Sequence, residues 1–147
     1  MRFEARARRP SVGIAILALV LVSLAAGGAV AVAGVPLRAV VKCEPAASPG
    51  RVRCEAEAHA EGAKITWGDV EIVKASASLS PLRGRIGPSD ATLKTDDTWR
   101  WGFALVAKER GIGQVEARVR AVVCVGGACV PETTTVVAEV VVGEKGP

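Results

Sequence analysis

The side chains with the most distinctive chemistry in this sequence are four cysteines: Cys43, Cys54, Cys124 and Cys129. Cys124 and Cys129 flank the run Val-Gly-Gly-Ala, in which Gly126-Gly127 is a strong turn signal. A Gly-Gly dipeptide between two β-like runs predicts a tight hairpin, so we expect these two thiols to face each other across its mouth. Such a pair either staples the hairpin or exchanges disulfides with a partner.

The first residues of the chain predict an export signal. Residues 2–9 are rich in arginine and lead into an uncharged run whose apolar centre spans residues 14–22. Ala31-Val-Ala33 then supplies an A-x-A cleavage site before Gly34. Cleavage at this site defines residues 1–33 as a signal peptide.

An uncleaved membrane anchor is the alternative interpretation of this segment. Residues 12–33 carry no charge and are long enough to span a bilayer as a helix. Under both interpretations residues 34–147 form one exported domain, which is periplasmic or secreted after cleavage and membrane-anchored otherwise.

Export changes what the cysteines are expected to do. All four lie in residues 34–147, and an even number in a small exported domain predicts two disulfides with three possible connectivities. Proximity in sequence favours Cys43–Cys54 and Cys124–Cys129. We interpret Cys43–Cys54 as structural, since closing its 12-residue loop stabilises the fold by about 3 kcal/mol on chain-entropy grounds. The same estimate for the shorter Cys124–Cys129 loop is about 2 kcal/mol.

The remaining sequence predicts strands and no helix. Residues 51–58 alternate Val52 and Cys54 with charged side chains, as in a half-buried strand. Residues 98–108 place Trp99, Trp101 and Phe103 on one face, which predicts the central core strand. About seven strands with turn signals between them indicate an all-β, immunoglobulin-like antiparallel β-sandwich, preceded by the signal or anchor helix.

Three further expectations concern how the strands are arranged. Residues 64–67 and 70–79 are predicted as separate strands broken at Gly68-Asp69, and residues 80–91 as a surface crossover between two sheets. In residues 115–123 the valines alternate with charged residues, and Cys124 falls on the same side of this alternation as Arg118 and Arg120. Either a bulge intervenes or this thiol lies on the more exposed face of its strand.

Composition and motifs disfavour several classes of function. The net charge of +4 does not describe the exported domain, because four arginines and one glutamate lie before residue 12. The rest of the chain has 15 basic and 14 acidic side chains, which are mixed along the sequence. No basic patch for nucleic acid is therefore expected. One histidine, His59, gives neither a catalytic triad nor a metal site, and no glycine-rich phosphate loop occurs. We expect no hydrolase, nucleotide or metal chemistry and no cofactor.

The run from Gly113 to Pro131, GQVEARVRAVVCVGGACVP, followed by a Val-rich strand to Val142, resembles a known family. It is similar to the active-site region of the periplasmic amino-terminal domain of the thiol:disulfide interchange protein DsbD and its stand-alone relatives. Those domains have an immunoglobulin-like fold in which a strand ends in a cysteine and a second cysteine precedes a proline.

The resemblance implies thiol–disulfide exchange through Cys124 and Cys129, with Cys129 forming the mixed disulfide. In the family the electrons come from a thioredoxin-like domain, so the implied partner of this chain is a thioredoxin-like protein. The family also shields its cysteines with an aromatic cap, for which the sequence offers no candidate because Tyr is absent and Phe103 belongs to the core strand. The alternative function is a non-catalytic, disulfide-stapled sandwich that binds another envelope protein.

Overall fold

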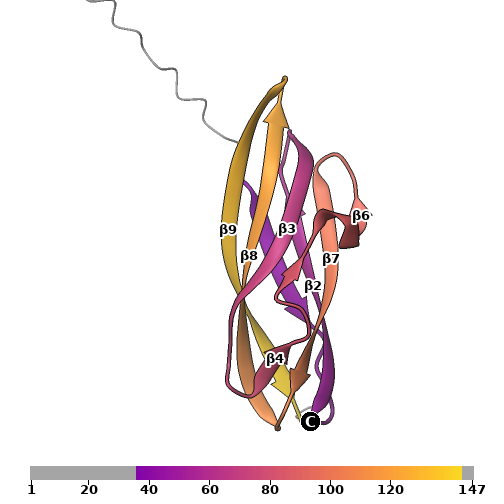
Figure 1. The fold of residues 1–147 in the computed structure, drawn as a ribbon, viewed down its shortest axis with the longest axis vertical. Coiled ribbons are helices and arrows are strands. Elements are labelled where there is room, and N and C mark those ends of the chain that lie inside the picture. Colours follow the sequence, from indigo (N-terminus) through magenta and orange to yellow (C-terminus); the bar gives the residue numbers. More distant parts are fainter. Residues whose placement is uncertain (1–35, 144–147) are drawn as a thin grey trace, which may run out of the picture. The chain divides into compact units, whose positions relative to one another are not determined.

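The computed structural model describes residues 36–143, which form two antiparallel β-sheets packed face to face (Figure 1). The longest strands are β3, with 12 residues, and β8 and β9, with 15 residues each. The elements are β1 (Arg38–Cys43), β2 (Gly50–His59), β3 (Lys64–Ala75), β4 (Leu79–Pro81), β5 (Arg85–Ile86), the 3₁₀ turn η1 (Pro88–Asp90), β6 (Ala91–Lys94), β7 (Thr98–Ala107), β8 (Gly111–Val125) and β9 (Ala128–Val142).

The first sheet has the order β1-β2-β7-β4, with β6 pairing the same edge of β7 further along. The second sheet has the order β5-β3-β8-β9. After β4 the chain leaves the first sheet, adds β5 to the second, and returns through η1 to β6. Residues 80–91, predicted as an irregular crossover, do pass between the sheets, but they include part of β4 and all of β5 and they begin and end in the first sheet. The all-β sandwich predicted from the alternation of side chains is the fold.

Alternating side chains from both sheets fill the core, as period-two patterns require. In β2 the inward residues Val52 and Cys54 are buried, and in β7 the inward stripe includes Trp101, which is completely buried. Small inward alanines on β2 make room for the two indoles of Trp99 and Trp101, whose ring centroids lie 5.9 Å apart. The aromatic strand predicted as central is therefore the middle of the core.

The predicted break at Gly68-Asp69 is wrong, because β3 runs continuously through both residues. A Cβ at Gly68 would lie 3.0 Å from the ring of Trp101, so the glycine permits close packing between the sheets instead of ending a strand. Asp69 is paired across the sheet with Arg120. Leu79, assigned by the sequence to the same strand, belongs to β4 in the opposite sheet.

Asp69 is the one buried charged residue of the described chain. Arg120 Nε donates to Asp69 Oδ1 over 2.8 Å, and Arg85 Nε donates to Asp69 Oδ2 over 2.6 Å. Burial opposes ionisation of the carboxyl, but the hydrogen bonds from Arg120 and Arg85 outweigh it and hold the pKa of Asp69 below its ordinary value. This cluster ties β5 to β8 across β3.

The predicted signal or anchor helix lies outside the described residues. Within residues 36–143 no helix is long and apolar enough to cross a membrane. Two disulfides are present in this small domain, and disulfides persist in oxidising compartments, which indicates an extracytoplasmic protein.

Candidate functional site

The β8–β9 hairpin positions Cys124 and Cys129. Its two-residue turn consists of Gly126 and Gly127, both with positive φ (55° and 86°), as a type I′ turn requires. This turn sets the register of the hairpin, which is uninterrupted over its whole length and pairs Cys124 directly with Cys129. The two sulfurs form a disulfide, and the Cα atoms lie 4.0 Å apart, close to the short spacing of a non-hydrogen-bonded pair. The predicted hairpin and its disulfide are confirmed.

The disulfide lies on the outer face of the second sheet. No bulge interrupts the pairing of β8 with β9 before Cys124. Cys124 therefore shares a face with Arg118 and Arg120 because this thiol lies on the more exposed face of its strand. Cys124 is half-buried, whereas Cys129 is exposed. The two arginines on the same face are already engaged, since Arg118 pairs with Glu71 and Arg120 with Asp69. They are therefore poor candidates for stabilising a thiolate.

A bulge in β3 brings a hydroxyl to the disulfide. The register between β3 and β8 shifts between Ile65 and Trp67, so Thr66 and Trp67 together oppose Val122. Thr66 Oγ1 consequently lies 3.6 Å from Cys124 Sγ and 3.3 Å from the carbonyl oxygen of Val122, to which it donates. The hydroxyl can donate to either acceptor, and a negatively charged sulfur would be the stronger one.

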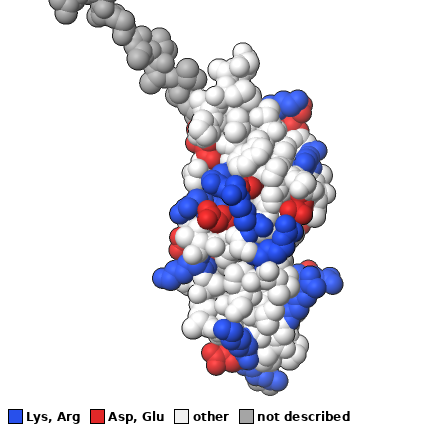
Figure 2. All heavy atoms as spheres, in the orientation of Figure 1, with Lys and Arg blue, Asp and Glu red and all other residues white. Residues whose placement is uncertain are grey.

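The tip of the hairpin is uncharged. Residues 121–131 contain no ionisable side chain apart from the bridged cysteines, and the upper end of the molecule is correspondingly white in Figure 2. Val125 is 48% exposed there, and Pro131 is also exposed. The register places the half-buried indole of Trp67 on the same face, beside Val122.

Thr66 and Trp67 are the residues of this site that the sequence analysis missed. Both had been assigned to a strand, but their proximity to Cys124 depends on the bulge and on pairing with β8, some 56 residues further along the chain. No local signal marks that contact. Trp67 is an aromatic side chain on the same face of the sheet as the disulfide, opposite Val122, which lies two residues before Cys124.

The second disulfide, Cys43–Cys54, joins β1 to β2 at a directly paired position, as proximity in sequence favoured. Cys54 is only 5% exposed and belongs to the core. The two disulfides thus differ in their surroundings. One joins the buried Cys54 to the half-buried Cys43, and the other lies on the outer face of the second sheet, where Lys64 is the partner of Cys124 on β3.

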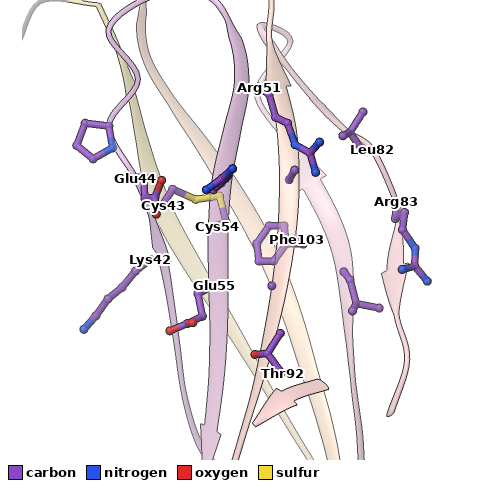
Figure 3. A pocket seen from close by; sticks show the side chains of 15 residues that line it. Lys42, Cys43, Glu44, Arg51, Cys54, Glu55, Leu82, Arg83, Thr92 and Phe103 are labelled. Carbon is purple, nitrogen blue, oxygen red and sulfur yellow. A yellow bond between two sulfur atoms is a disulfide. The ribbon is translucent and has the colours of Figure 1, made fainter. Parts of the chain in front are cut away.

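A groove of about 880 Å³ adjoins the buried disulfide. Figure 3 shows Cys43–Cys54 and Phe103 in its wall, with Arg51, Leu82 and Arg83 on the side toward β4. Its lining includes three cations that make no ion pair within residues 36–143, Lys42, Arg51 and Arg53, and also two carboxylates, Glu44 and Glu55.

No family model matches the chain, and no curated protein matches its sequence. One solved structure that matches the chain is that of AggA, the major subunit of aggregative adherence fimbriae type I from Escherichia coli. It shares 9% sequence identity with a TM-score of 0.39, and the match covers 74% of this chain and 97% of that one. No functional conclusion follows from this similarity.

Proposed function

We propose that this protein is an exported domain similar to the amino-terminal domain of DsbD, which exchanges disulfides through Cys124 and Cys129. The observation that carries the proposal is the unequal accessibility of the two sulfurs. Cys129 is exposed, whereas Cys124 is half-buried beneath the hydroxyl of Thr66. Exchange requires an incoming thiolate to reach one sulfur and the other sulfur to leave with negative charge.

The proposed reaction follows from this asymmetry. A thiolate of a thioredoxin-like partner attacks Cys129 Sγ, a partner–Cys129 disulfide forms, and the Cys124–Cys129 bond breaks. The electron pair of that bond remains on Cys124 Sγ as a thiolate, beside Thr66 Oγ1. The second thiol of the partner then attacks the partner sulfur of the mixed disulfide, which releases Cys129 as a thiolate. The partner leaves oxidised and this protein holds two reduced cysteines, which solvent protonates.

Two single variants test the order of attack. Cys124→Ser leaves the exposed Cys129 thiol, and Cys129→Ser leaves the half-buried Cys124 thiol. The thioredoxin retains only its nucleophilic cysteine, which is first converted to its mixed disulfide with thionitrobenzoate. We expect the free thiol of Cys124→Ser to displace thionitrobenzoate and form the protein–thioredoxin disulfide at least tenfold faster than that of Cys129→Ser. Equal rates would contradict the assigned order, and a reduction potential of the pair below about −300 mV would exclude exchange with physiological reductants.

A second candidate function is a non-catalytic sandwich that binds another envelope protein. The groove beside Cys43–Cys54 favours it, because Lys42, Arg51 and Arg53 lie around partly apolar walls without ion-pair partners in the described chain. Under this alternative, Arg51→Glu together with Arg53→Glu abolishes the cellular role, while Cys124→Ser together with Cys129→Ser leaves it intact. Loss of the role in a folded cysteine double variant favours exchange instead.

A further inference from the structure

A lysine is the cross-strand neighbour of Cys124. Lys64 of β3 is paired directly with Cys124 of β8, and both side chains lie on the outer face, since the next pair, Ile65 and Val123, is buried in the core. Residues directly opposite each other on one face of a sheet have Cβ atoms about 5 Å apart. The flexible four-carbon stem of lysine spans such a separation, so the ammonium group can reach Cys124 Sγ.

In the disulfide form this ammonium group is bound to a carboxylate. Lys64 Nζ lies 3.2 Å from Asp96 Oδ1, and Ile65 N donates to the carbonyl oxygen of Asp96 over 2.6 Å. Because that backbone bond uses the edge of β3 that does not face β8, Asp96 lies on the other side of Lys64 from Cys124. Lys64 is therefore placed between two acceptors, a carboxylate and a sulfur that is negative only while the disulfide is open.

The ion pair that holds Lys64 is a weak one. The side chains of Lys64 and Asp96 are 61% and 82% exposed, and such pairs contribute little because both groups stay hydrated when they separate. Arg120 on β8 differs, since its carboxylate, Asp69, is fully buried and would lose a partner in the interior. Lys64 can leave its carboxylate at little cost, whereas Arg120 cannot.

The other charged groups around Cys124 are less well placed. On β8 the nearest is Arg120, four residues or roughly 13 Å along the strand, and Arg118 is further away and also bound to a carboxylate. On β9 the side chain of Glu132 belongs to the inward-facing set, since it lies opposite a buried alanine of β8. A negative charge on Cys124 therefore has Lys64 as its closest cation by register.

We propose that Lys64 exchanges Asp96 for Cys124 Sγ when the Cys124–Cys129 disulfide opens, and that it stabilises the thiolate that leaves. This role rests on the exchange function proposed above. A partner thiolate forms a bond to Cys129 Sγ, the bond between the two sulfurs breaks, and its electron pair stays on Cys124 Sγ. Lys64 donates a hydrogen bond to that sulfur and transfers no proton. When the disulfide closes, the sulfur loses its charge and Lys64 returns to Asp96.

Reduction rates of Cys124–Cys129 in four variants test this exchange of partners, with thioredoxin and with dithiothreitol as reductants. Lys64→Gln removes the cation and should slow reduction about threefold, the size of one exposed charge contact. Lys64→Arg keeps the charge and should restore most of the rate. Asp96→Asn removes the competing carboxylate and should speed reduction about twofold. In Lys64→Gln with Asp96→Asn that gain should disappear.

The directions of these changes separate the proposed role from a purely structural ion pair. Lys64→Gln and Asp96→Asn break the same pair, so a structural contribution would change the rate in the same direction in both. That result, or a Lys64→Gln rate equal to that of the parent, overturns the proposal. The loss in Lys64→Gln should also vanish at about 1 M salt, where the Debye length is about 3 Å, and a loss that persists there contradicts a charge effect.

Alkylation of a single thiol tests Lys64 without a partner protein. Cys129→Ser leaves Cys124 as a free thiol, whose reaction with iodoacetamide follows the fraction of thiolate. Adding Lys64→Gln should move the midpoint of this reaction to higher pH by about half a unit, the equivalent of a threefold change. An unchanged midpoint overturns the proposal. If the midpoint moves but thioredoxin fails to reduce the parent protein, the exchange function is wrong and the contact of Lys64 with the Cys124 thiolate is supported.

Discussion

Thr66 Oγ1 lies 3.6 Å from Cys124 Sγ, although the two residues are 58 positions apart in the sequence. The contact exists because a bulge in β3 turns Thr66 toward the outer face, where β8 presents the cysteine. A hydroxyl beside the less accessible sulfur of a disulfide is well placed to donate to that sulfur once it carries negative charge. Thr66 is accordingly a positioning residue for the proposed exchange.

Replacing Thr66 by Val removes this donor while preserving the β-branched shape. Because a hydrogen bond is worth on the order of 1 kcal/mol, we expect reduction of Cys124–Cys129 by a thioredoxin to slow by about fivefold. Thr66→Ser keeps the hydroxyl and should restore the rate. Stopped-flow kinetics with equal amounts of folded protein measure the effect. A rate that falls equally in both variants would mean that Thr66 acts through packing alone.

The two disulfides should open in a fixed order. Cys129 is exposed and Cys54 is buried, so a reductant reaches Cys124–Cys129 first. A dithiothreitol titration followed by alkylation and peptide mass spectrometry should detect modified Cys124 and Cys129 before Cys43 and Cys54. Simultaneous opening would contradict the difference in accessibility.

The disulfides should also differ in what their loss costs the fold. Cys43→Ser with Cys54→Ser removes about 3 kcal/mol of loop restraint and places a hydroxyl in the core, where it costs more. Cys124→Ser with Cys129→Ser removes about 2 kcal/mol on the same basis, from an exposed hairpin end. Urea unfolding should therefore rank the first double variant as the less stable. The reverse order would show that the hairpin bridge is the main structural bond.

Close packing at Gly68 gives a prediction with a matched control. A methyl group at this position would meet the Trp101 ring at 3.0 Å and the Arg120 carbonyl oxygen at 3.3 Å. Gly68→Ala should destabilise the protein by about 1–3 kcal/mol through overpacking. Gly102→Ala places a methyl group 3.9 Å from its nearest neighbour, Thr92, and should change stability by less than about 1 kcal/mol. Thermal unfolding of the two variants compares them directly.

Much of the fold follows from local patterns. The period-two alternation around Val52, the aromatic stripe of Trp99 and Trp101, and the turn at Gly126-Gly127 each determine a strand or hairpin without distant information. The pairing of the cysteines is local too, because each bridge closes a hairpin. These features were predictable from the sequence.

The surroundings of the candidate site were not predictable, because they depend on contacts between distant strands. Gly68 and Asp69 have the composition of a turn, yet Gly68 accommodates Trp101 and Asp69 is neutralised by Arg85 and Arg120, so the strand continues. Similarly, nothing near Thr66 in the sequence marks its approach to Cys124. Single-sequence patterns identify which residues form a strand but not which side chains meet across a sheet.

The Asp69 cluster predicts how stability depends on pH. Burial opposes the charge of Asp69, and the bonds from Arg120 and Arg85 more than compensate, so its pKa is lower in the folded protein than in the unfolded chain. Ionised Asp69 therefore stabilises the fold above its ordinary pKa of about 4, and this contribution is lost as the pH falls through the lower folded value.

Asp69→Asn should cost about 2 kcal/mol at neutral pH, since charged hydrogen bonds become neutral ones and β5 loses its ionic link to β8. Urea unfolding from pH 7 to pH 2 should show the variant and the parent converging below about pH 4, and a difference that stays constant with pH would refute this role for the carboxylate.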